Sequence, residues 1–305
     1  MSGWLAPDWF NIDRTLGCRT STSSAHRARS SSQVCPPVTV GFRVVEAGIA
    51  TSVQDAGRPG YAHLGLGRSG IADQASAASL NRSVGNAETT PVLETAGGLV
   101  VECMSRSTVA ASGWTAPRVV AGGEHIRIDP APGQQWGYLA VASGLRGVPV
   151  LGSLSADTMA AITAISVTSG AHLEIGETRN VSLPDLIALP PHRHALTLIP
   201  GPHLDRFGST ALQLLVSTRW TVENNSRVGV RLSGGNVEVA DGSASAASEP
   251  MVVGALQVPP SGSPIILGRD HPVTGGYPVI AVVDDASMSQ ALGAAIGTTL
   301  SFRLS

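Results

Sequence analysis

The segment GALQVPPSGSPIILGRDHPVTGGYPVIAVV, residues Gly254–Val283, carries the strongest signals for fold and function in this chain. It contains two short apolar runs, Pro264–Leu267 and Pro278–Val283, each next to glycine or proline. Runs of this length with such boundaries are typical of buried strands rather than helices. The polar stretch between them contains Arg269, Asp270, His271, Thr274, Gly275, Gly276 and Tyr277.

This polar stretch is a candidate binding site for a small molecule. Paired glycines let the backbone turn tightly and let a ligand approach closely. Asp270, Thr274 and Tyr277 then supply a carboxylate, a hydroxyl and a phenol at the strand ends. Spacing alone favours a polar hairpin loop without a ligand, so further signals must decide.

The segment resembles the family of allophanate hydrolase subunit 2, also described as biotin-dependent carboxyltransferase-like. The family pattern is approximately GxxQVPxxGxPIxLxxDxQTTGGYPxIAxV, and the similarity is long and free of gaps. Pro272 and Val273 replace the glutamine and the first threonine of the QTT part. The positions that fit are Gly254, Gln257, Val258, Pro259, Gly262, Pro264, Ile265, Leu267, Asp270, Thr274, Gly275, Gly276, Tyr277, Pro278, Ile280, Ala281 and Val283.

A second signature of this family lies far from the first, in residues 52–86. The family pattern there is roughly TxQDxGRxGxxxxGxxxSGxxDxxxxxxAN followed by VGN, and the chain departs from it at Ser52 and Leu80. Two signatures in the correct order leave little room for coincidence. The positions that fit are Gln54, Asp55, Gly57, Arg58, Gly60, Gly65, Ser69, Gly70, Asp73, Asn81, Val84, Gly85 and Asn86.

The second signature offers groups that can either bind a ligand or brace a loop. Gln54 offers an amide, Asp55 a carboxylate, and Arg58 a guanidinium suited to a carboxylate or phosphate. An internal Asp55–Arg58 ion pair that holds a loop is an equally good interpretation. Asp73 is positioned to cap a helix over Gln74–Val84.

The composition indicates a globular chain without a field of positive charge. The 305 residues are 43% apolar and 14% charged, with a formal net charge of −2. The length predicts two domains, at about 150 residues each. No basic surface is expected to hold nucleic acid. All 20 basic residues are arginines, so a P-loop lysine, a Schiff-base lysine and a biotin attached to this chain are excluded.

The cysteine, histidine and apolar patterns predict neither a metal centre nor a membrane span. Cys103 ends an apolar run that is typical of a buried side chain, and the three cysteines lack metal-ligand spacing. His192 and His194 have no third ligand nearby in the sequence. No stretch reaches the roughly 18 apolar residues of a membrane span. We therefore expect a reduced, cytoplasmic protein without a metal.

The sequence divides into a tail and two halves. Residues 1–37 are serine-rich and lack hydrophobic periodicity, which predicts a disordered tail or a start codon placed too early. We expect a first subdomain over 38–182, a linker with proline and histidine over 183–194, and a second subdomain over 195–305.

Short β-branched or apolar segments between glycines and prolines fill both halves and predict a mainly β protein. A helix is expected over His203–Ser217, a strand over Val237–Ala240, and one or two helical turns over Met288–Leu292. Glu94 ends a predicted strand, so it is either a solvated carboxylate or a hydrogen-bond acceptor for a substrate. The segment NNSRVGVRL resembles the family's SDRxGxRL and carries Arg227 and Arg231.

The resemblance implies two tandem cyclophilin-like β-barrel subdomains with a few short helices. It also implies one subunit of a bacterial heteromer that opens 5-oxo-L-proline to L-glutamate and consumes ATP, bound on a partner or at an interface. The implied partners are an allophanate-hydrolase-subunit-1-like B protein and a LamB/YcsF-like A protein. The candidate residues are Asp55, Glu94, Asp270 and Tyr277 for orientation or proton transfer, and Gln54, Arg58, Asp73, Asn81, Arg227, Arg231, Gln257, Thr274, Gly275 and Gly276 for substrate binding.

Two alternatives remain open at this stage. The same fold resembles the carboxyl-transfer region of urea carboxylase, in which a partner's carboxybiotin would deliver CO₂ to an amide. Other relatives act without catalysis, as antagonists that bind a subunit-1-like inhibitor of a histidine kinase. Prolyl isomerisation is a weaker third possibility, because similarity to a cyclophilin barrel does not carry the activity.

Overall fold

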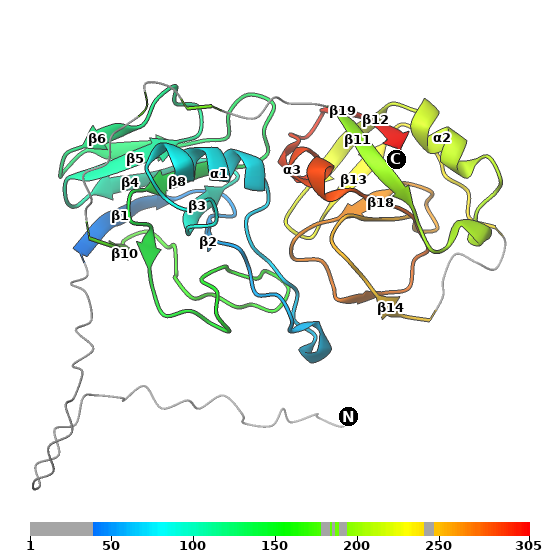
Figure 1. Cartoon of the computed structure of the whole chain (residues 1–305), viewed down its shortest axis with the longest axis horizontal. Helices are drawn as coiled ribbons and strands as arrows, with labels where there is room; N and C mark the ends of the chain where they lie inside the picture. Colours follow the sequence, from blue (N-terminus) through cyan, green and yellow to red (C-terminus); the bar gives the residue numbers. More distant parts are fainter. Residues whose placement is uncertain (1–38, 178–183, 185–186, 189–193, 241–246) are drawn as a thin grey trace, which may run out of the picture. The chain divides into compact units, whose positions relative to one another are not determined.

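The computed structural model describes residues 39–177, 184, 187–188, 194–240 and 247–305, which belong to one compact unit (Figure 1). The mainly β class predicted from the sequence is confirmed, with three α-helices and two short 3₁₀-helices among the described residues. The predicted tail over 1–37 and most of the predicted linker over 183–194 lie outside the described residues. The subdomain boundaries therefore stay predictions.

The first half consists of two five-stranded antiparallel sheets. In one sheet the order is β7-β4-β1-β10-β9, and in the other it is β2-β3-β8-β5-β6. The strands of the first sheet are β1 Thr39–Ala47, β4 Leu99–Cys103, β7 His125–Ile128, β9 Leu145–Arg146 and β10 His172–Ile175. Those of the second are β2 Ser52–Gln54, β3 Val92–Thr95, β5 Ser107–Ala111, β6 Arg118–Val120 and β8 Gly137–Val141.

A continuous apolar core lies between these two sheets. Every strand from β1 to β10 contributes at least one buried residue to it, and where a strand contributes several, they are alternate residues on one face. Cys103 on β4 belongs to this core and is completely buried, as the sequence predicts. Burial, together with the charge of Glu124, raises the pKa of its thiol to about 11, so the sulfur remains a protonated apolar side chain.

The second half closes into a seven-stranded barrel, in the order β11-β18-β15-β16-β13-β12-β19. Its neighbouring strands are antiparallel except β11 and β19, which pair in parallel. The apolar runs 264–267 and 278–283 become β16 and β18, but they do not pair with each other, because β15 lies between them. The strands are β11 Ala195–Pro200, β12 Trp220–Asn225, β13 Gly229–Ser233, β15 Ala255–Gln257, β16 Ile265–Leu267, β18 Val279–Val283 and β19 Thr299–Leu304. A separate two-stranded ladder joins β14 Glu249–Pro250 to β17 Thr274–Gly275.

Helices connect the two halves (Figure 1). Helix α1, Gln74–Ser83, starts where the sequence predicts, and the Asp73 side chain accepts a hydrogen bond from the Ser76 amide at its first turn. It packs on β8 and β5 and touches helix α3, Asp285–Gly293, which in turn packs on the barrel strand β11. One apolar core therefore runs from the outer face of a first-half sheet through these helices into the barrel.

Two predicted elements are wrong in extent, and the one or two turns predicted over Met288–Leu292 extend to the nine-residue helix α3. The helix predicted over His203–Ser217 is a 3₁₀ turn at Leu204–Arg206 and a separate helix α2 at Ala211–Ser217. Phe207 interrupts it because its backbone is extended and pairs with Val239. The strand predicted over Val237–Ala240 is reduced to this single bridge. None of the described helices is long and apolar enough to cross a membrane.

Candidate functional site

Arg227 lies at the centre of a buried ionic network. It follows β12 in the short turn that leads into β13, and only 4% of its surface is exposed. Its Nε and Nη2 atoms donate to the two carboxylate oxygens of Asp270, at 2.8 and 2.9 Å. Its Nη1 pairs with Glu94 Oε1, and Nη2 also donates to the carbonyl of Gly70 at 2.8 Å. Because Glu94 and Gly70 belong to the first half, this guanidinium binds the two halves together.

The second oxygen of Glu94 completes the network inside the first half. It accepts hydrogen bonds from the Ala72 amide at 2.8 Å and from the Tyr138 hydroxyl at 3.0 Å. The Tyr138 oxygen in turn accepts from the Asp73 amide. Burial raises the pKa of Tyr138 well above its usual value, and the charges of Glu94 and Asp73 raise it further. The phenol therefore stays protonated and serves as a donor to Glu94.

Asp270 is held as a charged carboxylate by the same arrangement. Its Oδ2 accepts from both the backbone amide and the hydroxyl of Thr158, at 3.0 and 2.9 Å. Burial by itself would raise the pKa of Asp270, but the charge and hydrogen bonds of Arg227 and the Thr158 donors outweigh it, so the pKa is lowered. Burial disfavours the Arg227 cation in the same way, yet Glu94 and Asp270 raise its pKa above the usual value. Arg227 and Asp270 are therefore both ionised and engaged with each other.

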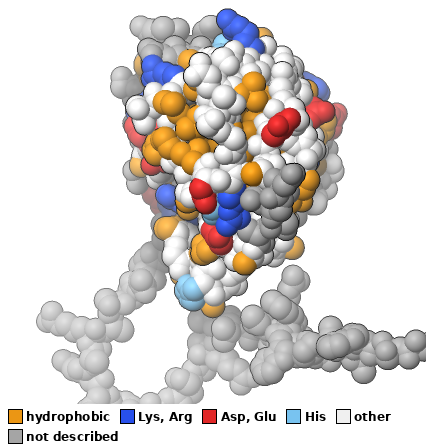
Figure 2. Space-filling model, turned by 90° about the vertical axis from the view of Figure 1, so that its right-hand side faces the viewer, with side chains coloured by type: hydrophobic (Ala, Val, Ile, Leu, Met, Phe, Trp, Pro, Cys, Tyr) orange, Lys and Arg blue, Asp and Glu red, His pale blue; other side chains and the backbone are white. Residues whose placement is uncertain are grey.

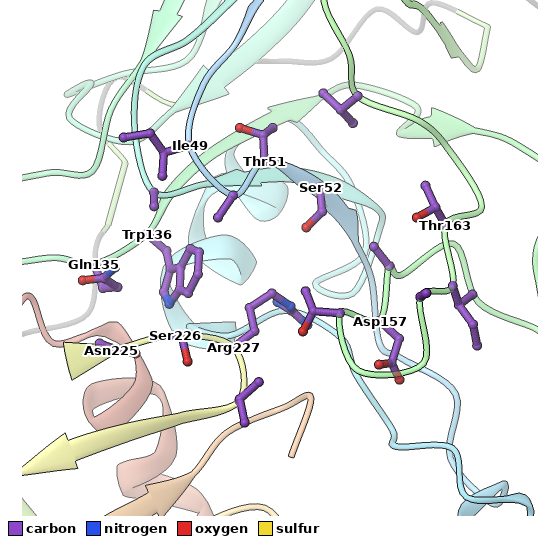
Figure 3. Close-up of a pocket in the computed structure, with 18 of the residues that line it drawn as sticks. Ile49, Thr51, Ser52, Gln135, Trp136, Asp157, Thr163, Asn225, Ser226 and Arg227 are labelled. Atoms are coloured by element: carbon purple, nitrogen blue, oxygen red, sulfur yellow. The ribbon is translucent and has the colours of Figure 1, made fainter. Parts of the chain in front are cut away.

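A cavity of about 620 Å³ lies against this network (Figure 3). Its walls come from the loop after β1, the segment 156–167 and the end of β12, so both halves of the fold contribute. In Figure 3 the Arg227 side chain lies between Trp136 on one side and Asp157 on the other. A volume of this size is typical of small-molecule sites. The labelled polar residues around it are Thr51, Ser52, Gln135, Asp157, Thr163, Asn225, Ser226 and Arg227.

Two residues of the cavity wall are locked in position by the backbone of the other elements. The Trp136 indole nitrogen donates to the Leu292 carbonyl at 3.1 Å. The Asn225 amide nitrogen donates to the carbonyls of Leu292 and Ala294, at 3.0 and 2.8 Å. These contacts join the cavity wall to the end of α3. A preformed wall with an aromatic face and several polar groups suits a small, flat, polar ligand.

The residues predicted from SVQDAGRPG brace a neighbouring loop. Asp55 accepts from the hydroxyls of Ser153 and Ser155 and from the Leu154 amide. Arg58 is almost completely buried, and its guanidinium donates to the carbonyl oxygen of Ser155. Both side chains therefore hold the loop around Ser153–Ser155 instead of pairing with each other. Gln54 lies behind the cavity and donates to the Ala156 carbonyl at 3.2 Å and to the hydroxyl of Ser52, which lines the cavity.

Three further predicted binding residues make no contact with the Arg227 side chain among the described residues, although the Asp73 amide donates to Tyr138. Asp73 caps helix α1, and Asn81 within that helix donates to the carbonyls of Glu88 and Thr90. Arg231 is an exposed side chain of β13. Their predicted contacts with a substrate stay predictions, whereas their structural roles are clear for Asp73 and Asn81.

The predicted residues of the TGGY segment form a second group, at the β14–β17 ladder. The Gln257 amide donates to the Tyr277 carbonyl at 3.2 Å and lies close to Gly275, where a Cβ atom would approach it to 2.9 Å. Thr274 and Tyr277 are exposed, with 43% of the tyrosine accessible. Gly276, the remaining predicted residue of this group, lies between Gly275 and Tyr277. No hydrogen bond or ion pair among the described residues links this group to Arg227.

Sequence reasoning missed several residues of the cavity. Thr158 lies in GSLSADTM, a segment with family resemblance, but nothing in its spacing connects it with Asp270. Trp136 and Ser52 carry no local signal, because a wall built from several separate segments of the chain has no sequence period. No group of three or more histidine, cysteine, aspartate or glutamate side chains in the described part of the chain is arranged to hold a metal ion.

The comparison with protein families decides the assignment of this chain. The family described as "Carboxyltransferase domain, subdomain A and B" matches residues 64–304. The chain belongs to this family. Two bacterial relatives of this carboxyltransferase-family chain are each named as the C subunit of 5-oxoprolinase. The protein of Escherichia coli strain K12 is 29% identical over 280 residues, which cover 86% of this chain and 90% of the relative. That of Haemophilus influenzae is 28% identical and covers 82% and 87%.

Larger proteins contain the same domain. Urea amidolyase of Lachancea kluyveri is 29% identical over 81% of this chain, but the match covers only 16% of that protein. Crystal structures of TTHA0988 superpose with a TM-score of 0.77 at 33% identity, over 87% of this chain and 56% of the other. The urea amidolyase of K. lactis gives a TM-score of 0.76 at 26% identity, over 86% and 18%. This carboxyltransferase-family chain thus spans about half of TTHA0988 and under a fifth of the urea amidolyases.

Proposed function

We propose that this chain is the C subunit of an ATP-dependent 5-oxoprolinase and that the cavity beside Arg227 binds the cyclic amide. The observation that carries the proposal is the similarity to two 5-oxoprolinase C subunits, which extends over nearly the whole of each relative. The cavity supports it, because it offers an aromatic wall and hydroxyl groups to a small, flat lactam. The chain acts in a cytoplasmic complex with a subunit-1-like B protein and a LamB/YcsF-like A protein.

In this proposal Glu94 and Asp270 hold the Arg227 side chain in position and do not transfer protons to or from the substrate. Glu94 and Asp270 are saturated by Arg227, Tyr138 and Thr158, so neither carboxylate is free to act as a base. They hold the guanidinium at the cavity wall, and the network keeps that part of the wall rigid around the substrate. The predicted catalytic roles of Asp55 and Tyr277 remain hypotheses, to be tested in the assembled complex.

Coupling to ATP follows from the chemistry of the lactam. Amide resonance makes the ring carbonyl a poor electrophile, and phosphorylation of its oxygen makes the carbon open to water. The chain has no lysine, so it has no P-loop lysine for the phosphates of a nucleotide. We therefore place ATP on a partner subunit or at an interface with one.

The proposal is tested by co-expression with the subunit-1-like and LamB/YcsF-like proteins of the same genome. We expect glutamate release from 5-oxoproline that requires ATP and disappears when this chain is omitted. Glutamate release that is unchanged without this chain would overturn the proposal.

A cavity variant locates the reaction within the complex. Thr163 is exposed at the rim of the cavity, so Thr163→Trp fills space without disturbing the core. We expect kcat/KM for 5-oxoproline to fall at least about tenfold, equivalent to about 1.4 kcal/mol of transition-state binding. Thr168→Trp is the matched control, because Thr168 is exposed in the same segment but does not line the cavity. Equal kinetics in both variants would place the substrate elsewhere.

Carboxyl transfer to an amide is the second candidate, favoured by the family description and by the two urea amidolyases. The chain cannot carry its own biotin because it has no lysine. A biotinylated partner would therefore have to deliver the carboxyl group. Consumption of bicarbonate and ATP with urea, in a complex that releases no glutamate from 5-oxoproline, would favour this function. A stable complex without turnover on either amide would favour a regulatory binding role.

A further inference from the structure

Two arginines without side-chain partners among the described residues lie on adjacent segments near the junction of the halves. The Ser69 amide donates to the Arg269 carbonyl at 3.2 Å, and a Cβ atom at Gly67 would lie 3.8 Å from the same oxygen. Segments 67–70 and 268–271 therefore run side by side. Arg68 is exposed on the first segment, and Arg269 is buried on the second, with 7% of its surface accessible.

Arg269 differs from the other two buried arginines of the molecule's described part. Arg227 is saturated by two carboxylates, and Arg58 donates to backbone carbonyls. Arg269 makes no side-chain hydrogen bond or ion pair with any described residue, and its Nε atom is completely enclosed. A buried guanidinium in this state lacks the acceptors that normally compensate its desolvation.

The charges around Arg269 do not supply that compensation. Burial lowers its pKa, and the positive charges of Arg68 and Arg227 lower it further, which outweighs the opposite effect of Tyr138 and Glu94. The Asp270 carboxylate is already paired with Arg227 and accepts a hydrogen bond from Thr158. Asp157, close to Gly67, already accepts from the Ser69 hydroxyl and from the amides of Met159 and Ala160.

The remaining neighbour, His271, cannot serve as the missing anion. Its Nδ1 lies 2.7 Å from the Pro272 carbonyl, which can only accept, so this nitrogen carries the hydrogen. Burial lowers the pKa of His271, so the ring is neutral at pH 7. The two adjacent segments therefore carry two cations, a neutral imidazole and, among the described residues, no available carboxylate.

We propose that Arg269 and Arg68 form a binding site for an oxyanion, namely the carboxylate or phosphate group of a small molecule. Arginine presents paired N–H groups whose geometry matches such a group. The buried Arg269 fixes the orientation of the oxyanion, and the exposed Arg68 provides attraction from solvent. The site does not depend on the proposed function, because any substrate or nucleotide with an oxyanion supplies the required charge.

The test measures thermal unfolding of the full chain during titration with inorganic phosphate and, separately, with acetate. Sodium chloride keeps the ionic strength constant. A ligand that binds only the folded state raises the midpoint temperature in a concentration-dependent way. We expect such a rise with at least one of the two anions, and an apparent Kd at least about tenfold weaker in Arg269→Met and in Arg68→Gln. Arg219→Gln is the matched control, because Arg219 is an exposed arginine remote in sequence from both segments, and its Kd should equal that of the wild type.

The two anions also show whether the ligand of this site carries a phosphate group or a carboxylate. A response to phosphate alone assigns the site to a phosphate group, and a response to acetate assigns it to a carboxylate. Arg269→Met should unfold at the same or a higher temperature than the wild type without added anion, because it removes an uncompensated buried charge. No response to either anion, or equal responses in the wild type and Arg269→Met, would overturn the proposal. A large loss of stability in Arg269→Met without anion would also contradict it.

Discussion

Arg227 shows how one side chain can determine the geometry of a site that it does not build alone. Its Nε and both Nη atoms contact acceptors that come from two different halves of the fold. Two buried carboxylates share one guanidinium; Tyr138 donates to the second oxygen of Glu94, and Thr158 donates to Asp270 Oδ2 in addition to Arg227. Such a network is expensive to desolvate, so its main effect is to make any single deletion costly and the wall of the cavity rigid.

Removal of one carboxylate tests this network. Asp270→Asn leaves Arg227 with one buried counter-ion, and we expect a loss of about 3–5 kcal/mol in the free energy of unfolding at pH 7. The folded-state pKa of Asp270 is lowered, so its stabilising effect is complete above the unfolded value of about 3.9 and disappears as the pH falls through the folded value. The difference between variant and wild type should therefore shrink below about pH 4. Urea denaturation at pH 7 and again below about pH 4 measures this difference in the free energy of unfolding.

Asp205→Asn is the control for that measurement, because Asp205 is an exposed carboxylate without an ion pair among the described residues. We expect this control to change stability by less than about 0.5 kcal/mol. A difference for Asp270→Asn that stays constant down to about pH 3 would show that the charge of Asp270 does not carry the effect.

For single residues, the sequence identifies the members of the network better than it identifies the contacts between them. Glu94, Arg227 and Asp270 all stand out from family-like motifs, yet Arg227 is 133 positions from Glu94 and 43 from Asp270. Spacing over such distances carries no information about contact. Arg269 was visible in the polar segment, but only burial reveals that it lacks a partner among the described residues.

Among the elements, helix α1 illustrates a residue with two competing interpretations. The sequence predicts Asp73 both as a helix cap and as a substrate contact, and the structure shows the cap to Ser76. We expect Asp73→Ala to cost about 0.5–2 kcal/mol, whereas Asp73→Asn should cost only a few tenths, because asparagine is as good a cap. Chemical denaturation measures both variants.

The cap of α3 provides the matched comparison. Asp284 accepts from the Ser287 amide in the same manner, so Asp284→Ala should lose a similar amount. Equal losses for Asp73→Asn and Asp73→Ala would indicate that the charge of Asp73, and not its capping oxygen, is what the structure needs. Loss of activity in Asp73→Asn at unchanged stability would restore the substrate-binding interpretation.

The elements that sequence reasoning located best are those with local signals. α1 has a capping residue before it and Gly85 after it, and β16 and β18 are apolar runs with clear boundaries. The break at Phe207 has a weaker local signal, because its extended backbone depends on pairing with Val239. The insertion of β15 between β16 and β18 likewise depends on barrel closure, which no local pattern specifies.

For the whole molecule, the boundary between the two halves is not a boundary between cores. The core that fills the barrel continues through α3 and α1 to the outer face of a first-half sheet. Trp136 and Gln135 of the first half bind the backbone at the end of α3. The face in Figure 2 carries apolar side chains among scattered charges, with no continuous basic field over its described residues. The sequence predicts two units but not their shared core. The linking contacts come from α1 and α3, and the sequence patterns of these helices do not indicate which side packs against the other half.

A shared core predicts that both halves unfold in one cooperative transition. In native-state hydrogen exchange, the most protected amides of β8 in the first half and β18 in the barrel should report the same free energy of opening. Leu292→Ala at the end of α3 removes a buried side chain next to both halves and should lower that free energy by about 2–5 kcal/mol in β8 and β18 alike. Leu173→Ala, whose side chain belongs to the core between the two first-half sheets, is the companion variant and should have the same global effect. If either substitution weakens protection only in its own half, the halves fold independently, and the Arg227 network with the cavity beside it would then be a docking contact between two autonomous domains.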